Sequence, residues 1–237
     1  MPKLYGIWKS VDDIDFDKLP KSFVLKTNHD CGGVVLVPDK QSFLANKVSF
    51  NKSMQKLKEH LATNYYELYK EYHYKDIEPR VFAEELLGAN LTATNANQSI
   101  ENGDFQAKND ITIESNAYNA PDDYKFHCFG KAKSKHIYIQ VDTERFTNHT
   151  RTIFDLKWQK MDFEFCYQMP SYVPQQPKNF ALMLQIAKAL SQDLNVRVDL
   201  YNPCDCVIVG ELTFTHGGGT EKFNPPKWDK RFGEMWE

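Results

Sequence analysis

Apolar residues recur every three or four positions in two stretches of the chain, and each stretch predicts an amphipathic helix. In residues 52–72 the stripe consists of Met54, Leu57, Leu61, Tyr65 and Leu68. In residues 178–194 it consists of Phe180, Leu184, Ala187, Leu190 and Leu194. This spacing places side chains on one face of a helix, so we expect both stripes to be buried.

Short β-prone runs separated by turn formers predict strands. Runs 23–26 and 33–37 flank the polar loop Thr27–Gly33, which indicates a hairpin. The other runs are 80–87, 124–129, 136–141, 196–201 and 206–214. Because strands and helices do not alternate regularly, the order predicts an α+β fold with mostly antiparallel strands rather than a doubly wound sheet. Residues 88–122 are rich in Asn, Thr, Ala and Asp, which indicates an inserted loop.

Composition narrows the possible functions. The chain has 237 residues, of which 41% are hydrophobic, so it can bury a sizeable core as one large domain or two small lobes. Its net charge of −3 gives no support to a general nucleic-acid binder or membrane-surface binder. No apolar run approaches the ~18 residues of a membrane span. The five cysteines form no CxxC pair and the N-terminus lacks a signal-peptide pattern, so we expect reduced thiols and a cytoplasmic location.

The segments Val196–Tyr201 and Gly210–Phe214 carry the most informative polar residues. Alternate residues of a strand share a face, so Arg197 and Asp199 point together, and so do Glu211 and Thr213. Two carboxylates on paired strands suit Mg²⁺ with phosphate, and an arginine beside them suits a transferring phosphoryl group. Asp199 and Glu211 share a face only if the hairpin loop is odd in length or contains a bulge. The alternative is an exposed sheet face with a structural ion pair.

Three further segments carry possible binding residues. Lys26 precedes a loop of small residues, as in phosphate sites, although an ordinary turn with a solvated lysine has the same pattern. Glu84 and Glu85 end an apolar strand, which fits either an adenine and ribose hinge or an edge strand protected by charge. Asp123 and Lys125 share a strand face, which fits an internal ion pair.

In their order along the chain, these segments resemble the ATP-grasp superfamily, and they look most like its teichuronopeptide-biosynthesis (TupA-like) branch. The resemblance covers nearly the whole chain. It rests on Leu19-Pro20 with Phe23-Val-Leu-Lys-Thr-Asn-His29, Pro79-Arg-Val-Phe-Ala-Glu-Glu85, Asp123-Tyr-Lys-Phe126 with Cys128-Phe-Gly130, Arg197-Val-Asp-Leu-Tyr201 and Gly210-Glu-Leu-Thr-Phe214.

The resemblance implies a single ATP-grasp unit over residues 1–237, in which two α+β lobes clamp a nucleotide. The smaller lobe would span approximately residues 20–87, with the glycine-rich loop and the hinge strand. Residues 88–122 would be an insertion, and residues 123–237 the larger lobe with the metal site. The family usually has a further segment before Tyr5, so we expect this chain to be a shorter form.

The resemblance also implies residue roles and two cofactors, ATP and Mg²⁺. The expected ATP contacts are Lys26 at the phosphates, Asn28, Gly32 and Gly33 in the closing loop, Glu84, Glu85 and Leu86 at the adenine hinge, and Asp123 at the ribose. The expected catalytic residues are the transition-state arginine Arg197 and Lys125, which reaches a phosphate. The expected magnesium ligands are Asp199, Glu211 and Thr213, although the superfamily often has Asn at the third position.

The implied activity is ATP-dependent carboxylate–amine ligation through an acyl phosphate. For this branch, the expected substrates are a uronic acid carboxylate of a bacterial surface polysaccharide and an amino acid or amine. The protein would then work beside membrane-associated polysaccharide machinery, without a membrane span and without nucleic acid. The alternatives are a glycan-modifying kinase or glycosyltransferase of the same pathway, or a degenerate module that only binds nucleotide or glycan. The absence of a DxD motif weakens the glycosyltransferase alternative.

Overall fold

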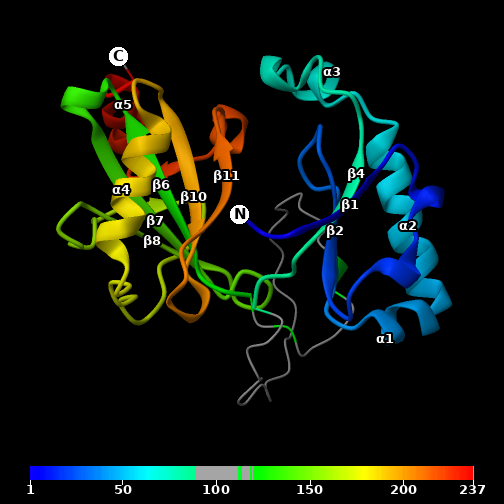
Figure 1. The fold of residues 1–237 in the computed structure, drawn as a ribbon. Coiled ribbons are helices and arrows are strands. Elements are labelled where there is room, and N and C mark those ends of the chain that lie inside the picture. The colour runs from blue at the N-terminus through cyan, green and yellow to red at the C-terminus, as the bar shows by residue number, and fades with distance from the viewer. Residues whose placement is uncertain (89–111, 114–117, 119, 237) are drawn as a thin grey trace. The chain divides into compact units, whose positions relative to one another are not determined.

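Separate hydrophobic cores form in the two halves of the chain, each on its own β-sheet (Figure 1). The structure is a computed structural model that describes residues 1–88, 112–113, 118 and 120–236. The N-terminal unit comprises Pro2–Asn119, and the C-terminal unit comprises Ala120–Glu237 together with Met1. Most of the predicted inserted loop, residues 88–122, lies outside the described residues.

The N-terminal unit is built on a sheet with strand order β1-β4-β2-β3-β5. Its strands are β1 (Leu4–Trp8), β2 (Phe23–Thr27), β3 (Val34–Val37), β4 (Val81–Glu84) and β5 (Thr112–Ile113). Neighbours are antiparallel apart from β3 and β5. Its helices are α1 (Lys40–Ala45), α2 (Lys47–Leu61) and α3 (Tyr65–Tyr69), with 3₁₀ turns at Val11–Asp13, Phe16–Lys18 and Tyr72–Tyr74. The predicted hairpin of residues 23–37 is therefore confirmed as β2 and β3.

One face of this sheet is apolar and packs against α2. Leu25 of β2 and Ala83 of β4 lie in the core together with Met54 and Leu57 of α2. Because side chains alternate along a strand, Lys26 and Glu84 project from the opposite face. The core therefore fixes the side of the sheet on which these two polar residues lie.

The single helix predicted for residues 52–72 is wrong, because the chain forms two helices there. α2 begins earlier, at Lys47, where the Asn46 side chain accepts a hydrogen bond from the Ser49 amide. α3 begins after Asn64, whose side chain accepts from the Glu67 amide. An asparagine that satisfies free amides in this way starts a new helix. Met54 and Leu57 are buried as predicted, whereas Leu68 is 64% exposed.

The C-terminal unit is built on a fully antiparallel sheet with strand order β11-β10-β6-β7-β8. Its strands are β6 (Asp123–Phe129), β7 (His136–Thr143), β8 (Thr150–Phe154), β10 (Val196–Tyr201) and β11 (Ile208–Thr213). β9 (Glu164–Phe165) and β12 (Phe223–Asn224) pair separately. The remaining elements are α4 (Phe180–Ser191), α5 (Lys227–Glu234) and 3₁₀ turns at Ala132–Ser134, Pro203–Asp205 and His216–Gly219. The α+β class with mostly antiparallel sheets is confirmed.

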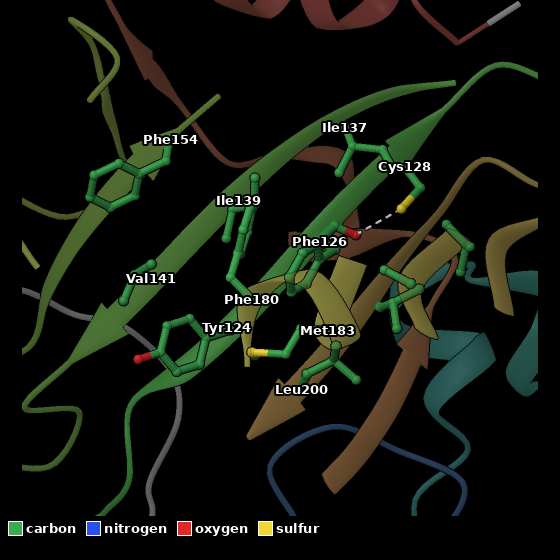
Figure 2. Close-up of a cluster of buried hydrophobic side chains, with 13 residues drawn as sticks. Tyr124, Phe126, Cys128, Ile137, Ile139, Val141, Phe154, Phe180, Met183 and Leu200 are labelled. Carbon is green, nitrogen blue, oxygen red and sulfur yellow. Dashed lines mark hydrogen bonds between the residues drawn. The ribbon is translucent and has the colours of Figure 1, made fainter. Parts of the chain in front are cut away.

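Helix α4 covers one face of this second sheet (Figure 1). Phe180 and Met183 of α4 pack onto Phe126, Ile139 and Leu200 of three neighbouring strands, as Figure 2 shows. Residues adjacent to these in sequence, such as Lys125 and Asp199, must therefore point away from α4. Because of this packing, the polar side chains lie on the face of the sheet opposite the apolar core.

The helices differ from their predictions in extent and in number. The stripe predicted for residues 178–194 is correct at Phe180 and Ala187 but wrong at Leu190 and Leu194, which are exposed. Leu194 lies beyond the end of α4 at Ser191. The sequence patterns did not identify α5, which lies in the tail from Thr215 that is rich in Gly and Pro. Among the described residues, no helix combines the length and apolar character needed to cross a bilayer.

We predict that Leu57→Ala lowers the free energy of unfolding by about 2–5 kcal/mol, because it leaves a cavity beneath the first sheet. Leu57 is fully buried in α2. Leu68→Ala is the matched control, and its effect should stay within about 0.5 kcal/mol. Urea denaturation of both variants measures the difference, and equal losses would contradict the described core.

Candidate functional site

A polar face lies on the side of the C-terminal sheet opposite α4. It consists of Asp123, Lys125 and His127 of β6, Gln140 and Asp142 of β7, Arg151 of β8, Arg197, Asp199 and Tyr201 of β10, and Glu211 and Thr213 of β11. Cross-strand pairing arranges these residues in rows, one of which runs Glu211, Asp199, Lys125, Gln140. Residues paired in register project on the same side of a sheet, so each row brings its side chains together.

The predicted shared face of Asp199 and Glu211 is confirmed. The two residues are direct partners in the β10–β11 ladder, and Arg197 pairs with Thr213. The register shifts between Asp199 and Leu200, which is the irregularity that the sequence required. The sheet therefore gathers the arginine and the two carboxylates that the sequence singled out.

Five charged side chains of this region form a chain of alternating sign, which we call the charge chain: Arg197, Asp199, Lys125, Asp123 and Arg145. Arg197 Nε lies 2.7 Å from Asp199 Oδ1, and Lys125 Nζ lies 2.5 Å from Asp199 Oδ2. Lys125 Nζ also lies 2.6 Å from Asp123 Oδ2. Arg145 Nη1 lies 2.7 Å from the same Asp123 oxygen. The predicted Asp123–Lys125 ion pair is confirmed.

Burial disfavours the charged forms of the residues in the charge chain. Burial by itself would raise the pKa of Asp199, but Lys125 and Arg197 outweigh it and hold that pKa below its usual range. Burial would lower the pKa of Lys125, but Asp123 and Asp199 raise it above its ordinary value. Lys125, Asp199 and the two arginines, whose pKa values the carboxylates raise, therefore stay charged at neutral pH. With Glu211, which lies 3.1 Å from Arg197 Nη2, the three cations of the charge chain meet three carboxylates.

Glu211 and Thr213 lie at the Arg197 end of the charge chain. Glu211 Oε1 lies 3.1 Å from Arg197 Nη2 and accepts from the Thr213 hydroxyl at 3.0 Å. The Glu211 side chain is 63% exposed, whereas Asp199 is buried and both of its oxygens already accept hydrogen bonds.

The Glu211 carboxylate and the Thr213 hydroxyl are oxygens of the kind that a hard divalent cation binds, whereas both Asp199 oxygens are occupied by Arg197 and Lys125. Within the described residues, no group of three or more His, Cys, Asp or Glu side chains could hold a metal. A cation at Glu211 and Asp199 would therefore depend on ligands from outside these side chains.

The other half of the polar face holds a network that the sequence analysis missed. His127 Nε2 lies 2.8 Å from Gln140 Oε1, and Gln140 Nε2 donates to Asp142 Oδ2. Arg151 pairs with Asp142 at 2.6 Å. Burial lowers the pKa of His127 well below its usual value, so its imidazole is neutral. Cross-strand distances were needed to find this network, since its members come from three strands.

In the N-terminal unit, Lys26 pairs with the predicted hinge residue Glu84, with Nζ 2.5 Å from Oε1. The lysine side chain stays partly exposed. Glu85 exchanges hydrogen bonds with the backbone of Lys3 beside β1, and Leu86 is buried. The structure therefore brings Lys26 and Glu84 together but turns Glu85 toward the N-terminal segment.

The predicted glycine-rich loop is held by hydrogen bonds at both ends. Asn28 donates to the Glu78 carbonyl and accepts from the Arg80 amide at 2.7 Å. A Cβ at Gly33 would overlap Thr27 Oγ1, so only glycine fits there. Gly32, beside it, has a φ of +100°.

Asp30, which the sequence analysis did not single out, links this loop to α2. Its carboxylate accepts from the Thr27 hydroxyl and contacts His60 Nδ1. The neighbouring His29 is buried, with Nε2 3.1 Å from the Thr63 carbonyl oxygen. Side chains of the loop thus fix its conformation against the helix, which leaves the loop backbone in a defined position.

We predict that Asp199→Asn lowers the free energy of unfolding at pH 7 by about 3 kcal/mol or more, because it leaves two buried cations underpaired. Because the pKa of Asp199 is lower in the folded protein than in the unfolded chain, its ionised form stabilises the fold above about pH 3.9, the unfolded pKa. This stabilisation is lost as the pH falls through the folded pKa. The difference between wild type and variant should therefore shrink below about pH 4. Denaturant titrations from pH 7 to 3 test this. The exposed Glu211→Gln is the control, with a change within about 1 kcal/mol, and a pH-independent difference would contradict the ion pairing.

Comparisons with known proteins identify the family of the chain. A solved structure of D-alanine–D-alanine ligase from Bacillus anthracis aligns with 99% of this chain at 14% identity and a TM-score of 0.43. The chain spans 59% of the length of that ligase. The comparison with curated proteins finds no match. The TupA-like ATPgrasp family matches residues 1–98 and 88–237, which together cover the chain. The chain therefore belongs to the TupA-like ATP-grasp family.

Proposed function

We propose that this protein is an ATP-dependent carboxylate–amine ligase. The γ-phosphoryl group of ATP passes to a carboxylate oxygen, which gives an acyl phosphate and ADP. An amine then attacks the acyl carbon, an amide forms, and phosphate leaves. The observation that carries this proposal is the charge chain on the polar face of a chain that belongs to an ATP-grasp family.

The charge chain suits phosphoryl transfer because its cations are held in place before any ligand binds. Phosphoryl transfer depends mainly on positioning and on stabilising negative charge at the phosphate oxygens. Lys125 and Arg197 are each fixed by buried carboxylates, so little reorganisation is needed when charge develops. A solvated surface lysine would lack this fixed position.

The roles that we assign to the C-terminal unit follow from its donors and acceptors. Arg197 and Lys125 bind oxygens of the transferring phosphoryl group. Asp199, Glu211 and the Thr213 hydroxyl would hold Mg²⁺, which supplies charge neutralisation at the phosphates. Thr213 also orients Arg197, because its Oγ1 lies 3.0 Å from Arg197 Nη2. Asp123 also keeps Lys125 in place, through a second ion pair at 2.6 Å.

We assign the nucleotide-binding residues of the N-terminal unit from the same proposal. Lys26 contacts a phosphate, and Glu84 orients its ammonium group. Backbone amides of the loop that contains Gly32 and Gly33 bind phosphate oxygens, because the loop conformation is fixed by Asn28 and Asp30. Leu86 and the Glu85 carbonyl supply backbone groups to the adenine, because the Glu85 amide already donates to the Lys3 carbonyl.

The substrate class is part of the proposal and is supported by family membership. We propose a uronic acid carboxylate of a bacterial surface polysaccharide as the acceptor and an amino acid or small amine as the nucleophile. The protein would act in the cytoplasm beside the machinery that assembles the polysaccharide. Incubation with ATP, Mg²⁺, glucuronic acid and an amino-acid mixture tests this. ADP release that requires both substrates supports the ligase, a stable phosphosugar would indicate a kinase, and binding without turnover would indicate a binding module.

We predict that Glu211→Gln lowers kcat at least about 100-fold, in the range for removing one electrostatic contact of a transition state. Its exposure means that the fold should be retained, which circular dichroism can check. Glu234→Gln, at an exposed position of α5, is the matched control and should keep wild-type kcat. Wild-type turnover in Glu211→Gln would reject the metal assignment.

We predict that Lys26→Ala weakens ATP binding about tenfold or more, as expected for loss of a charged hydrogen bond. Titration calorimetry with ATP measures the change. Lys18→Ala removes an exposed lysine of the same unit and should bind ATP as wild type does. Equal affinities for Lys26→Ala and Lys18→Ala would exclude Lys26 from the phosphate site.

A further inference from the structure

Arg145 is the one member of the charge chain that the sequence motifs do not contain. It follows β7, in the turn that leads to β8, where the Thr147 amide donates to the Glu144 carbonyl at 3.0 Å. Its guanidinium reaches back to the end of the polar face where Asp123 and Tyr201 are cross-strand partners. Arg145 and Arg197 therefore occupy opposite ends of the charge chain.

The hydrogen bonds of Arg145 leave part of its guanidinium available. Nη1 donates to Asp123 Oδ2 at 2.7 Å and lies 3.5 Å from the Tyr201 hydroxyl. Within the part of the chain that the structure describes, Nε and Nη2 have no acceptor, and Asp122 and Glu144 form no ion pair with this arginine. The side chain is 27% exposed. The Nε and Nη2 groups can therefore donate hydrogen bonds to a ligand from solvent.

Arg151 shows what a purely structural arginine looks like on the same sheet. Its side chain is 7% exposed, and Nε, Nη1 and Nη2 all donate to protein acceptors. Asp142 receives two of these bonds, so the charge is paired within the protein. Arg145 differs in exposure and in its unused donors, although both arginines contact a buried aspartate.

Asp123 fixes Arg145 relative to Lys125. Its Oδ2 is shared by Lys125 Nζ and Arg145 Nη1, so both cations lie against one oxygen. Asp123 is fully buried, and its Oδ1 has no partner among the described residues. A buried carboxylate that already binds two cations is better placed to hold them than to reach a ribose.

We propose that Arg145 binds a phosphate oxygen of the nucleotide, as a third cation beside Lys125 and Arg197. This inference rests on the proposed ATP-dependent function. A guanidinium presents paired N–H groups that match the oxygens of a phosphate, and its charge persists at every working pH. The unused Nε and Nη2 donors of the partly exposed Arg145 side chain give such an anion its contacts.

Titration calorimetry of Arg145→Gln with ATP and with adenosine tests the proposal. We expect ATP affinity to fall about tenfold or more, since a charged hydrogen bond is lost, while adenosine affinity stays at the wild-type value. Arg145→Lys keeps the charge beside Asp123 but loses the paired donors, so a smaller loss for ATP alone is expected. Arg231→Gln, which removes an arginine of α5 in the same unit, should match wild type for both ligands.

Two results would overturn this role. Unchanged ATP affinity in a folded Arg145→Gln protein would exclude a phosphate contact. An equal loss for ATP and adenosine would show that Arg145 only supports the fold. If Arg145→Gln does not fold, the same comparison with Arg145→Lys decides the matter. Failure of the wild-type protein to bind ATP would instead overturn the proposed function itself.

Discussion

A buried lysine between two carboxylates determines the chemistry of the C-terminal unit. Lys125 lies within 2.6 Å of Asp123 and within 2.5 Å of Asp199, and each carboxylate holds a further arginine. Burying any of these charges alone would cost several kcal/mol, on the order of the ionic desolvation penalty. The alternating order of signs removes that cost and leaves the outer arginines with donors that can face an anion. The same ion pairs therefore both position the cations and stabilise the fold.

The apolar side of the sheet makes this arrangement possible. Phe126 and Leu200 pack beneath α4, which fixes the register in which Lys125 and Asp199 become partners (Figure 2). A slip of one residue would turn the charges into the core and the aromatic side chains into water. The same logic holds in the N-terminal unit, where Leu25 and Ala83 lie in the core and Lys26 and Glu84 meet on the other face.

Strand alternation allowed the sequence to predict much of the site. Period-two spacing on two strands joined by a short turn predicts that one face carries Arg197, Asp199 and Glu211. The same spacing on one strand predicts that Asp123 and Lys125 lie together. It does not predict the position of Arg145 or the network of His127, Gln140 and Asp142, because these contacts cross several strands or a turn. The helix prediction for 52–72 failed at Asn64, where one side-chain cap outweighs a continuous apolar stripe. Cross-strand neighbours depend on tertiary structure, whereas the Asn64 cap is a local contact within four residues of the chain.

We propose that the polar face of the C-terminal sheet binds the phosphates of ATP. A crystal structure with a non-hydrolysable ATP analogue and Mg²⁺ is the sharpest test. Triphosphate density should lie against Lys125 and Arg197, with a metal ion at Asp199 and Glu211. Triphosphate bound elsewhere, with the ion pairs of Lys125 and Arg197 intact and no ligand density beside them, would contradict it.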